Sequence, residues 1–309
     1  MYSLNIEKST LVLNKEQVLR NIQKMVEKAR KNGVRFRPHF KTHQSAQIGE
    51  WFRDFGVESI TVSSMDMAEY FMNYERDDIT VTFPVNVLEI HRINLLAPKI
   101  RLNLLVESTE TVSYLGEKIS SNANVWLKID VGYKRTGIPV EKADLVIKLV
   151  KEIEIAKNLR FTGLLTHAGH SYYTKSPEEI VAIHQESVFL SNNLREKLQE
   201  NGIEDVQISI GDTLTCSLAD DFSDVDEIRP GNFLFYDLTQ RALGSCQEEN
   251  IAVVVACPVV AKHVDRKELV IYGGAIHFSL SYLERNDNTK IYGYMALPTN
   301  SGWKNLRED

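Results

Sequence analysis

The chain has 309 residues, of which 43% are hydrophobic and 25% charged, a composition typical of folded globular proteins. A formal charge of −6 predicts no basic surface for nucleic acid. The first residues contain no signal-peptide-like apolar segment, and no apolar run reaches the about 20 residues that cross a bilayer. Three cysteines without a CxxC pair favour the reducing cytoplasm over a disulfide framework.

Short β-branched strands alternate with helical segments over residues 14–243. Asn14 is placed to cap a helix that runs to about Arg30, and further helices are predicted at 45–55 and 65–74. We predict strands at 34–40, 59–62, 79–83, 101–106, 125–129, 160–165, 206–209 and 226–228. Eight such units predict an α/β fold, a (β/α)8 barrel of the TIM type, although an open doubly wound sheet would give a similar pattern.

The pattern changes after Leu243. Residues 251–262, 268–272 and 290–295 read as strands without intervening helices. We therefore expect a mostly-β domain over 244–309, with residues 1–13 as a strand that pairs with it. This domain looks too short to close, so we expect it to be incomplete.

The segment RPHFKTH, residues 37–43, lies at the C-terminal end of the first predicted strand. Catalytic groups of barrel enzymes gather at that end of the strands. Burial and a neighbouring cation, Arg37, His39 or His43, would lower the pKa of Lys41. A less protonated amine can attack an aldehyde, whereas the competing interpretation is a solvated lysine that merely follows a strand.

Two further strand ends carry polar groups. Arg135 follows the strand at 125–129 in KIDVGYKRTG, and its guanidinium is always charged. His167, His170 and Tyr172 follow the strand at 160–165 in THAGHSY. A histidine of near-neutral pKa can move protons at pH 7, but the sequence does not separate His167 from His170.

The segment SIGDT, residues 209–213, follows the seventh predicted strand, a common phosphate position in barrels. Glycine permits close backbone approach, and hydroxyl and backbone N–H groups bind phosphate oxygens. Asp212 would have to point away from a phosphate dianion. Tyr236 lies after the eighth strand in EIRPGNFLFYD.

Six segments in this order resemble the fold-type III pyridoxal 5′-phosphate (PLP) enzymes related to alanine racemase, closest to the D-threonine aldolase and D-serine dehydratase branch: RPHFKTH, KIDVGYKRTG, THAGHSY, SIGDT, EIRPGNFLFYD and YGGAIHFS. The resemblance implies a Schiff base on Lys41, a small amino-acid substrate and a homodimer. The expected catalytic residues are Lys41, Arg135, His167 and His170. The expected cofactor-binding residues are Lys41, His39, Arg135, Tyr172, Ser209, Gly211, Asp212, Thr213 and Tyr236.

The resemblance favours a lyase acting on a small D-amino acid, by dehydration or aldol cleavage. A racemase of the alanine racemase type ranks lower, because no segment matches the tyrosine that serves those enzymes as second base. A non-catalytic PLP-binding protein and a PLP-free, metal-dependent barrel enzyme stay open at this point. A β domain after Leu243 argues against the non-catalytic protein, because proteins of that kind consist of the barrel alone.

The resembling enzymes of this branch also hold a divalent metal, zinc or manganese, through a His-x-Cys or His-x-Asp pair near the C-terminus. The C-terminal residues 302–309 contain no such pair, and the His-x-Asp of residues 244–309, His263-Val264-Asp265, lies well before the C-terminus. We therefore expect no metal site of that type in this chain and weak or absent lyase activity, while PLP can still bind the barrel.

Overall fold

The computed structural model describes residues 5–284, 287–299 and 302–306. Its centre is a sheet of eight parallel strands: β2 (Arg35–Phe36), β3 (Ile60–Val62), β4 (Asp78–Pro84), β5 (Arg101–Val106), β6 (Ala123–Asp130), β8 (Leu159–Leu165), β9 (Gln207–Ile210) and β10 (Glu227–Ile228). The strands are neighbours in chain order, and β10 returns to pair with β2.

The sheet closes between its first two strands. His39 forms a parallel bridge with Thr61 of β3, and the Thr61 N–H donates to the carbonyl of Pro38 at 2.9 Å. The prediction of a (β/α)8 barrel is therefore confirmed, and the carboxyl ends of all eight strands open at one end, which we call the mouth.

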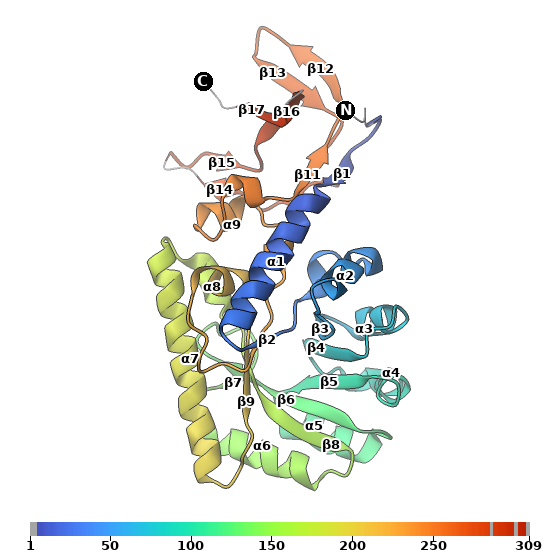
Figure 1. Cartoon of the computed structure of the whole chain (residues 1–309), viewed down its shortest axis with the longest axis vertical. Helices are drawn as coiled ribbons and strands as arrows, with labels where there is room; N and C mark the ends of the chain where they lie inside the picture. The colour runs from blue at the N-terminus through green and yellow to red at the C-terminus, as the bar shows by residue number, and fades with distance from the viewer. Residues whose placement is uncertain (1–4, 285–286, 300–301, 307–309) are drawn as a thin grey trace.

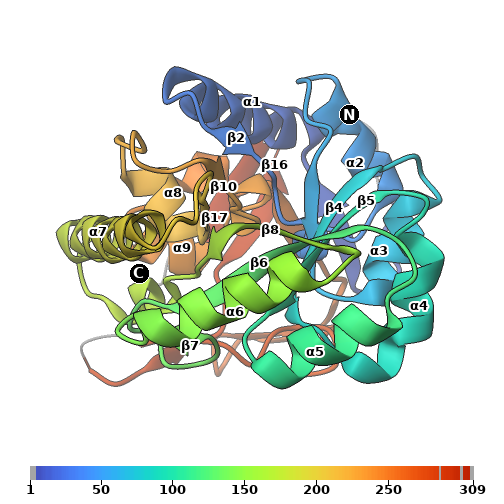
Figure 2. The ribbon, with the colours of Figure 1, turned by 90° about the horizontal axis from the view of Figure 1, so that it is seen from below.

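Helices surround the strands, as Figures 1 and 2 show. They are α1 (Lys15–Lys31), α2 (Ala46–Arg53), α3 (Met65–Met72), α4 (Ile90–Leu96), α5 (Thr109–Lys118), α6 (Ala143–Ile155), α7 (Pro177–Glu200), α8 (Thr213–Leu218) and α9 (Leu238–Ala242). Short 3₁₀ turns are η1 (Phe40–Thr42), η2 (Val87–Glu89), η3 (Gly169–Tyr173), η4 (Asn232–Leu234) and η5 (Glu248–Asn250). A two-residue strand, β7 (Ile138–Pro139), adds to the end of β6. None of the described helices is both long and apolar enough to cross a membrane.

Side-chain caps explain where several helices begin. The Asn14 side chain accepts from the Gln17 N–H at the start of α1, as its position predicted, and Ser45 caps α2 in the same way. The first strand is shorter than the predicted 34–40. Pro38 has no N–H to donate, and the chain turns into η1 at Phe40. Lys41 therefore lies in a tight turn just beyond the strand.

The described strands after the barrel form hairpins. Strand β11 (Val253–Ala256) pairs antiparallel with β1 (Thr10–Leu13). Separate two-stranded sheets follow: β12 (Val259–His263) with β13 (Glu268–Ile271), β14 (Leu283–Glu284) with β15 (Lys290–Ile291), and β16 (Met295–Thr299) with β17 (Gly302–Leu306). The strand predicted at 251–262 is interrupted at Pro258.

The hairpins attach where α1 begins, which is the mouth end of the barrel (Figure 1). They leave apolar side chains accessible, including Val260 at 58% and Val264 at 70% exposed, whereas the barrel buries a continuous core between its strands and helices. The mostly-β character of this region is confirmed, while the domain boundaries at 13/14 and 243/244 remain a prediction.

Candidate active site at the barrel mouth

Lys41 sits in η1, and His39 holds the start of that turn. The His39 Nδ1 accepts the backbone N–H of Lys41 at 3.3 Å, so the proton of the neutral ring lies on Nε2. The Nε2 atom contacts the hydroxyl of Thr82 at 3.2 Å, which itself donates to the Val62 carbonyl. Burial and the nearby charge of Lys41 hold the pKa of His39 well below its ordinary value. His39 is thus a neutral side chain that stabilises the turn containing Lys41.

The Lys41 side chain reaches solvent, yet its ammonium group stands within the mouth. Withdrawal from water, followed by the charges of Arg135 and Arg229, lowers the pKa of Lys41. No carboxylate of the described residues forms an ion pair with Lys41. The lowered pKa agrees with the prediction, but the cations responsible are Arg135 and Arg229 and not Arg37, His39 or His43.

Arg135 belongs to the loop that follows β6. Its guanidinium carbon lies 4.9 Å from the ring centre of Tyr133, a cation–π contact. Arg135 is exposed, and no carboxylate of the described chain pairs with it. It is a free guanidinium at the mouth, close enough to Lys41 to influence its pKa.

His167 and His170 both flank the ring of Tyr133, at 5.9 and 6.3 Å between ring centres. The His167 Nδ1 bonds the carbonyl of Gly211, so Nδ1 carries the proton and Nε2 presents a lone pair. Burial lowers the pKa of His167 to about 3, which corrects the expectation of a near-neutral histidine at this position. The Nδ1 of His170 is buried without a hydrogen-bond partner among the described residues.

Lys128 lies inside the barrel near the end of β6 and is 5% exposed. Its Nζ reaches only the Ile129 carbonyl among the described groups, at 3.4 Å, and burial with the charges of Arg229 and Arg135 lowers its pKa to about 7. Lys128 is consequently a group whose charge changes around neutral pH.

The loop from β9 into α8 contains the predicted phosphate segment. The buried Asp212 carboxylate accepts from Thr215 N–H (2.8 Å), the Thr215 hydroxyl (2.7 Å) and the Ser171 hydroxyl (3.2 Å). It therefore caps α8 rather than facing the mouth, and burial raises its pKa to about 6. The Tyr172 hydroxyl accepts from Gln240 and from the backbone of Thr213.

Three predicted cofactor residues have other neighbours. The Ser209 hydroxyl is fully buried, donating to Glu227 at 2.7 Å and accepting from Arg229 Nε at 2.6 Å. A Cβ on Gly211 would lie 2.9 Å from the Cβ of Arg229, so that glycine makes room for an arginine. The Tyr236 hydroxyl pairs with Ser217 of α8 at 3.2 Å. The Ser209 and Tyr236 hydroxyls are therefore already hydrogen-bonded within the protein, and a ligand would have to compete for them.

Sequence reasoning assigned no role to Arg229, Lys128 or Tyr133, although each lies in a quoted segment. Arg229 is buried, bonds the carbonyl of Thr166, and lowers the pKa values of Lys41, His39 and His167. Lys128 did leave a signal, because a lysine interrupts the apolar strand VWLKID. Tyr133 left none, because its ring partners His167, His170 and Tyr173 are distant in sequence.

Among the described residues, no group of three or more His, Cys, Asp or Glu side chains could hold a metal ion.

Comparison with known proteins identifies the family. A model of the alanine racemase N-terminal domain matches residues 13–239. D-serine dehydratase of Dictyostelium discoideum is 30% identical over 290 residues, covering 87% of this chain and 73% of the relative. D-threo-3-hydroxyaspartate dehydratase of Delftia sp. (strain HT23) is 27% identical over 275 residues, covering 88% and 72%. Its solved structure matches with a TM-score of 0.85 at 24% identity, over 97% of this chain and 84% of that one. The resemblance read from the six segments is confirmed, and the chain belongs to the alanine racemase N-terminal domain family.

Proposed function

We propose that the protein is a PLP-dependent lyase that acts on a small D-amino acid with a β-hydroxyl group. The observation that carries this proposal is Lys41, an amine of lowered pKa at the barrel mouth, with two guanidinium groups nearby and no carboxylate partner among the described residues. The names of the two relatives, both dehydratases of D-hydroxy amino acids, support the substrate class.

The residues at the mouth fit PLP in charge. A phosphate dianion suits a site whose cations Lys41, Arg135 and Arg229 lack ion pairs within the described chain, and the Asp212 carboxylate is turned into α8. Lys41 would hold the aldehyde carbon, His39 would support that lysine, and Thr213 with Tyr172 would border the phosphate. Bound PLP would supply an electron-withdrawing ring that weakens bonds at the substrate α-carbon.

The chain's own groups suggest a division of roles. Arg135 is free to bind the substrate carboxylate, since guanidinium and carboxylate groups match in a bidentate geometry. The Lys41 Nζ can accept a proton once it is unprotonated. His167 offers a lone pair at Nε2 but, with a pKa of about 3, does not donate a proton as imidazolium at neutral pH.

Product analysis tests the proposal. The purified chain with added PLP is incubated with D-serine and with D-threo-3-hydroxyaspartate, with and without added zinc or manganese. Ammonia with a 2-oxo acid indicates dehydration, and glycine with an aldehyde product indicates aldol cleavage. L-serine and the Lys41→Ala variant are the controls. Weak product formation would agree with the expectation from the missing C-terminal metal pair, whereas absence of every product under all conditions, or racemisation alone, would contradict a lyase.

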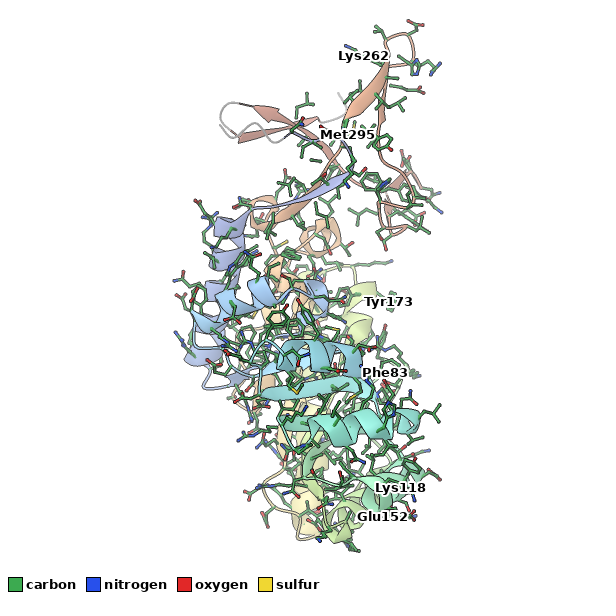
Figure 3. The ribbon with its side chains drawn as sticks, turned by 90° about the vertical axis from the view of Figure 1, so that its right-hand side faces the viewer. Phe83, Lys118, Glu152, Tyr173, Lys262 and Met295 are labelled. Atoms are coloured by element: carbon green, nitrogen blue, oxygen red, sulfur yellow. The ribbon has the colours of Figure 1, made fainter. Side chains whose placement is uncertain are left out.

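We also infer a homodimer, as the resemblance implied. Phe83 and Tyr173 are 64% and 77% exposed on one side of the molecule (Figure 3), and large exposed apolar side chains are a common feature of subunit interfaces. Sedimentation equilibrium should give twice the 35.3 kDa chain mass, whereas a monomer at micromolar concentration would contradict this inference. A cytoplasmic location remains a prediction from the cysteines.

A further inference from the structure

Tyr133 lies between the loops that follow β6 and β8 at the mouth. Its ring lies among the rings of His167, His170 and Tyr173, at 5.9, 6.3 and 6.5 Å between centres, and under the guanidinium of Arg135. Three of these four neighbours are expected catalytic residues. Its hydroxyl makes no hydrogen bond with the described residues, so the contacts of Tyr133 are those of its ring.

Hydrogen bonds fix the backbone on both sides of Tyr133 in the loop. The carboxylate of Asp130 accepts the N–H of Gly132 at 3.0 Å and the N–H of Lys134 at 3.0 Å. Gly132 has φ +115° and Lys134 has φ +56°, a left-handed conformation that a lysine adopts only when its surroundings enforce it. Tyr133 therefore projects from a fixed turn rather than from a loose loop.

Gly169 leaves the space in which the ring lies. A Cβ at residue 169 would meet the Tyr133 ring at Cε1, at Cζ (2.6 Å) and at Cδ1 (2.8 Å). Contacts below 3.0 Å cannot persist, so any side chain there must displace the ring. Gly169 belongs to η3, between the two histidines, and its backbone φ is not in the left-handed region. The glycine is thus explained by the tyrosine ring and not by the turn.

We propose that Tyr133 is a positioning residue. Its ring fixes the positions of the Arg135 guanidinium and the His167 ring for the reaction, and Gly169 leaves the space that the ring occupies. The proposal rests on the lyase function proposed above. Within the described chain, the Tyr133 ring is the contact that the structure shows for the Arg135 guanidinium, and it also packs against His167. Moving the ring should move both groups.

A double-mutant cycle tests this coupling. Gly169→Ala should reduce kcat/KM for D-serine by on the order of 10–100-fold, because small displacements of positioned groups have effects of this size. Tyr133→Ala should cause a similar loss, mainly through KM as Arg135 loses its support. In the Tyr133→Ala background, Gly169→Ala should have little further effect, because no ring remains to be displaced. Tyr133→Phe keeps the ring and should stay within about threefold of the original kcat/KM, since an interaction of the hydroxyl is not needed.

A second readout needs neither PLP nor turnover. Burial lowers the pKa of His167 to about 3, the charge of Arg135 adds to the lowering, and the Tyr133 ring packs beside both groups. NMR titration of the PLP-free protein should show the His167 pKa rising towards its ordinary value of 6.5 in Tyr133→Ala and Gly169→Ala, but not in Tyr133→Phe. Gly293→Ala is the matched glycine control, because a Cβ there meets no atom within 4 Å.

Independent, additive losses in the cycle, or an unchanged His167 pKa in Tyr133→Ala, would overturn the positioning role. If Gly169→Ala does not fold, Tyr133→Ala and Tyr133→Phe still decide the question by titration. If the unmodified chain has no lyase activity while the titration behaves as described, the proposed function fails and the ring's control of His167 stands.

Discussion

The two ends of the barrel differ in whether their cationic side chains form ion pairs. At the base, where the strands begin, Arg37 is 1% exposed and paired on both sides: Nε lies 2.7 Å from Glu227 and Nη1 lies 2.6 Å from Asp78. Ser59 and Asn103 also donate to Asp78, at 2.9 and 3.0 Å. Every charge in this group has an internal partner.

Towards the mouth, Lys41, Arg135, Lys128 and Arg229 form no ion pair with the described residues, although the buried Arg229 bonds Ser209 and the Thr166 carbonyl. Repulsion among these cations contributes to the lowered pKa values of Lys41 and Lys128. Unpaired cations lower the stability of the fold when they are buried away from water. The unpaired cations at the mouth are therefore suited to bind anions from solution, unlike the paired charges at the base. PLP and an amino acid bring a phosphate and a carboxylate.

Breaking the paired end should have the largest effect on stability. Arg37→Met leaves the Glu227 and Asp78 carboxylates underpaired in the barrel, and we expect a loss of about 3–5 kcal/mol in the free energy of unfolding. Urea denaturation at pH 7 measures it. The matched control is Arg266→Ala, which removes an exposed pair with Glu268 and should cost less than about 1 kcal/mol. Equal effects in the two variants would show that the base is not a specially paired region.

Removing an unpaired cation should instead increase the free energy of unfolding. The pKa of Lys128 is about 7 in the fold against an ordinary 10.5, so its contribution to stability is complete above pH 10.5 and is lost as pH falls towards 7. Lys128→Met should therefore stabilise the PLP-free protein by about 1–4 kcal/mol at pH 6.5, and the gain should shrink at pH 10. A gain that does not change with pH, or a loss at pH 6.5, would mean that Lys128 is paired after all.

The turn behind Lys41 should make the mouth sensitive to acid. His43 packs against Phe40 and Phe52, and burial lowers its pKa to about 3. The unfolded chain binds this proton near pH 6.5, so stability is full above 6.5 and is lost as pH falls towards 3. His43→Asn keeps an acceptor for the Ser45 N–H. Between pH 7 and 5 the original protein should lose about 2 kcal/mol more than this variant, as measured by denaturation at both pH values. Parallel losses would contradict the role of His43.

Local chemistry explains what the sequence could predict. Helix starts depend on one side chain and its neighbours three residues on, so the cap at Asn14 could be predicted. The position of Lys41 followed from a strand end, a local feature, although the strand itself ended sooner because of Pro38 and the following turn.

Distant packing explains what the sequence could not predict. The composition of its segment predicted Ser209 as a phosphate ligand, but it could not predict that the Ser209 hydroxyl also bonds Glu227 and Arg229, which come from another strand and its end. Likewise, Tyr133 packs against Gly169 from a loop that is distant in sequence, and neither segment alone predicts this contact.

The central claim is that Lys41 is the amine that binds PLP, and one measurement tests it directly. The full chain is incubated with PLP, reduced with borohydride, digested, and mapped by peptide mass spectrometry. We expect one phosphopyridoxyl adduct per chain, on the peptide containing Lys41, and its loss in Lys41→Ala. Lys128, the other lysine of lowered pKa near the mouth, is the internal competitor. An adduct on Lys128, adducts spread over surface lysines, or unchanged labelling in Lys41→Ala would contradict the claim.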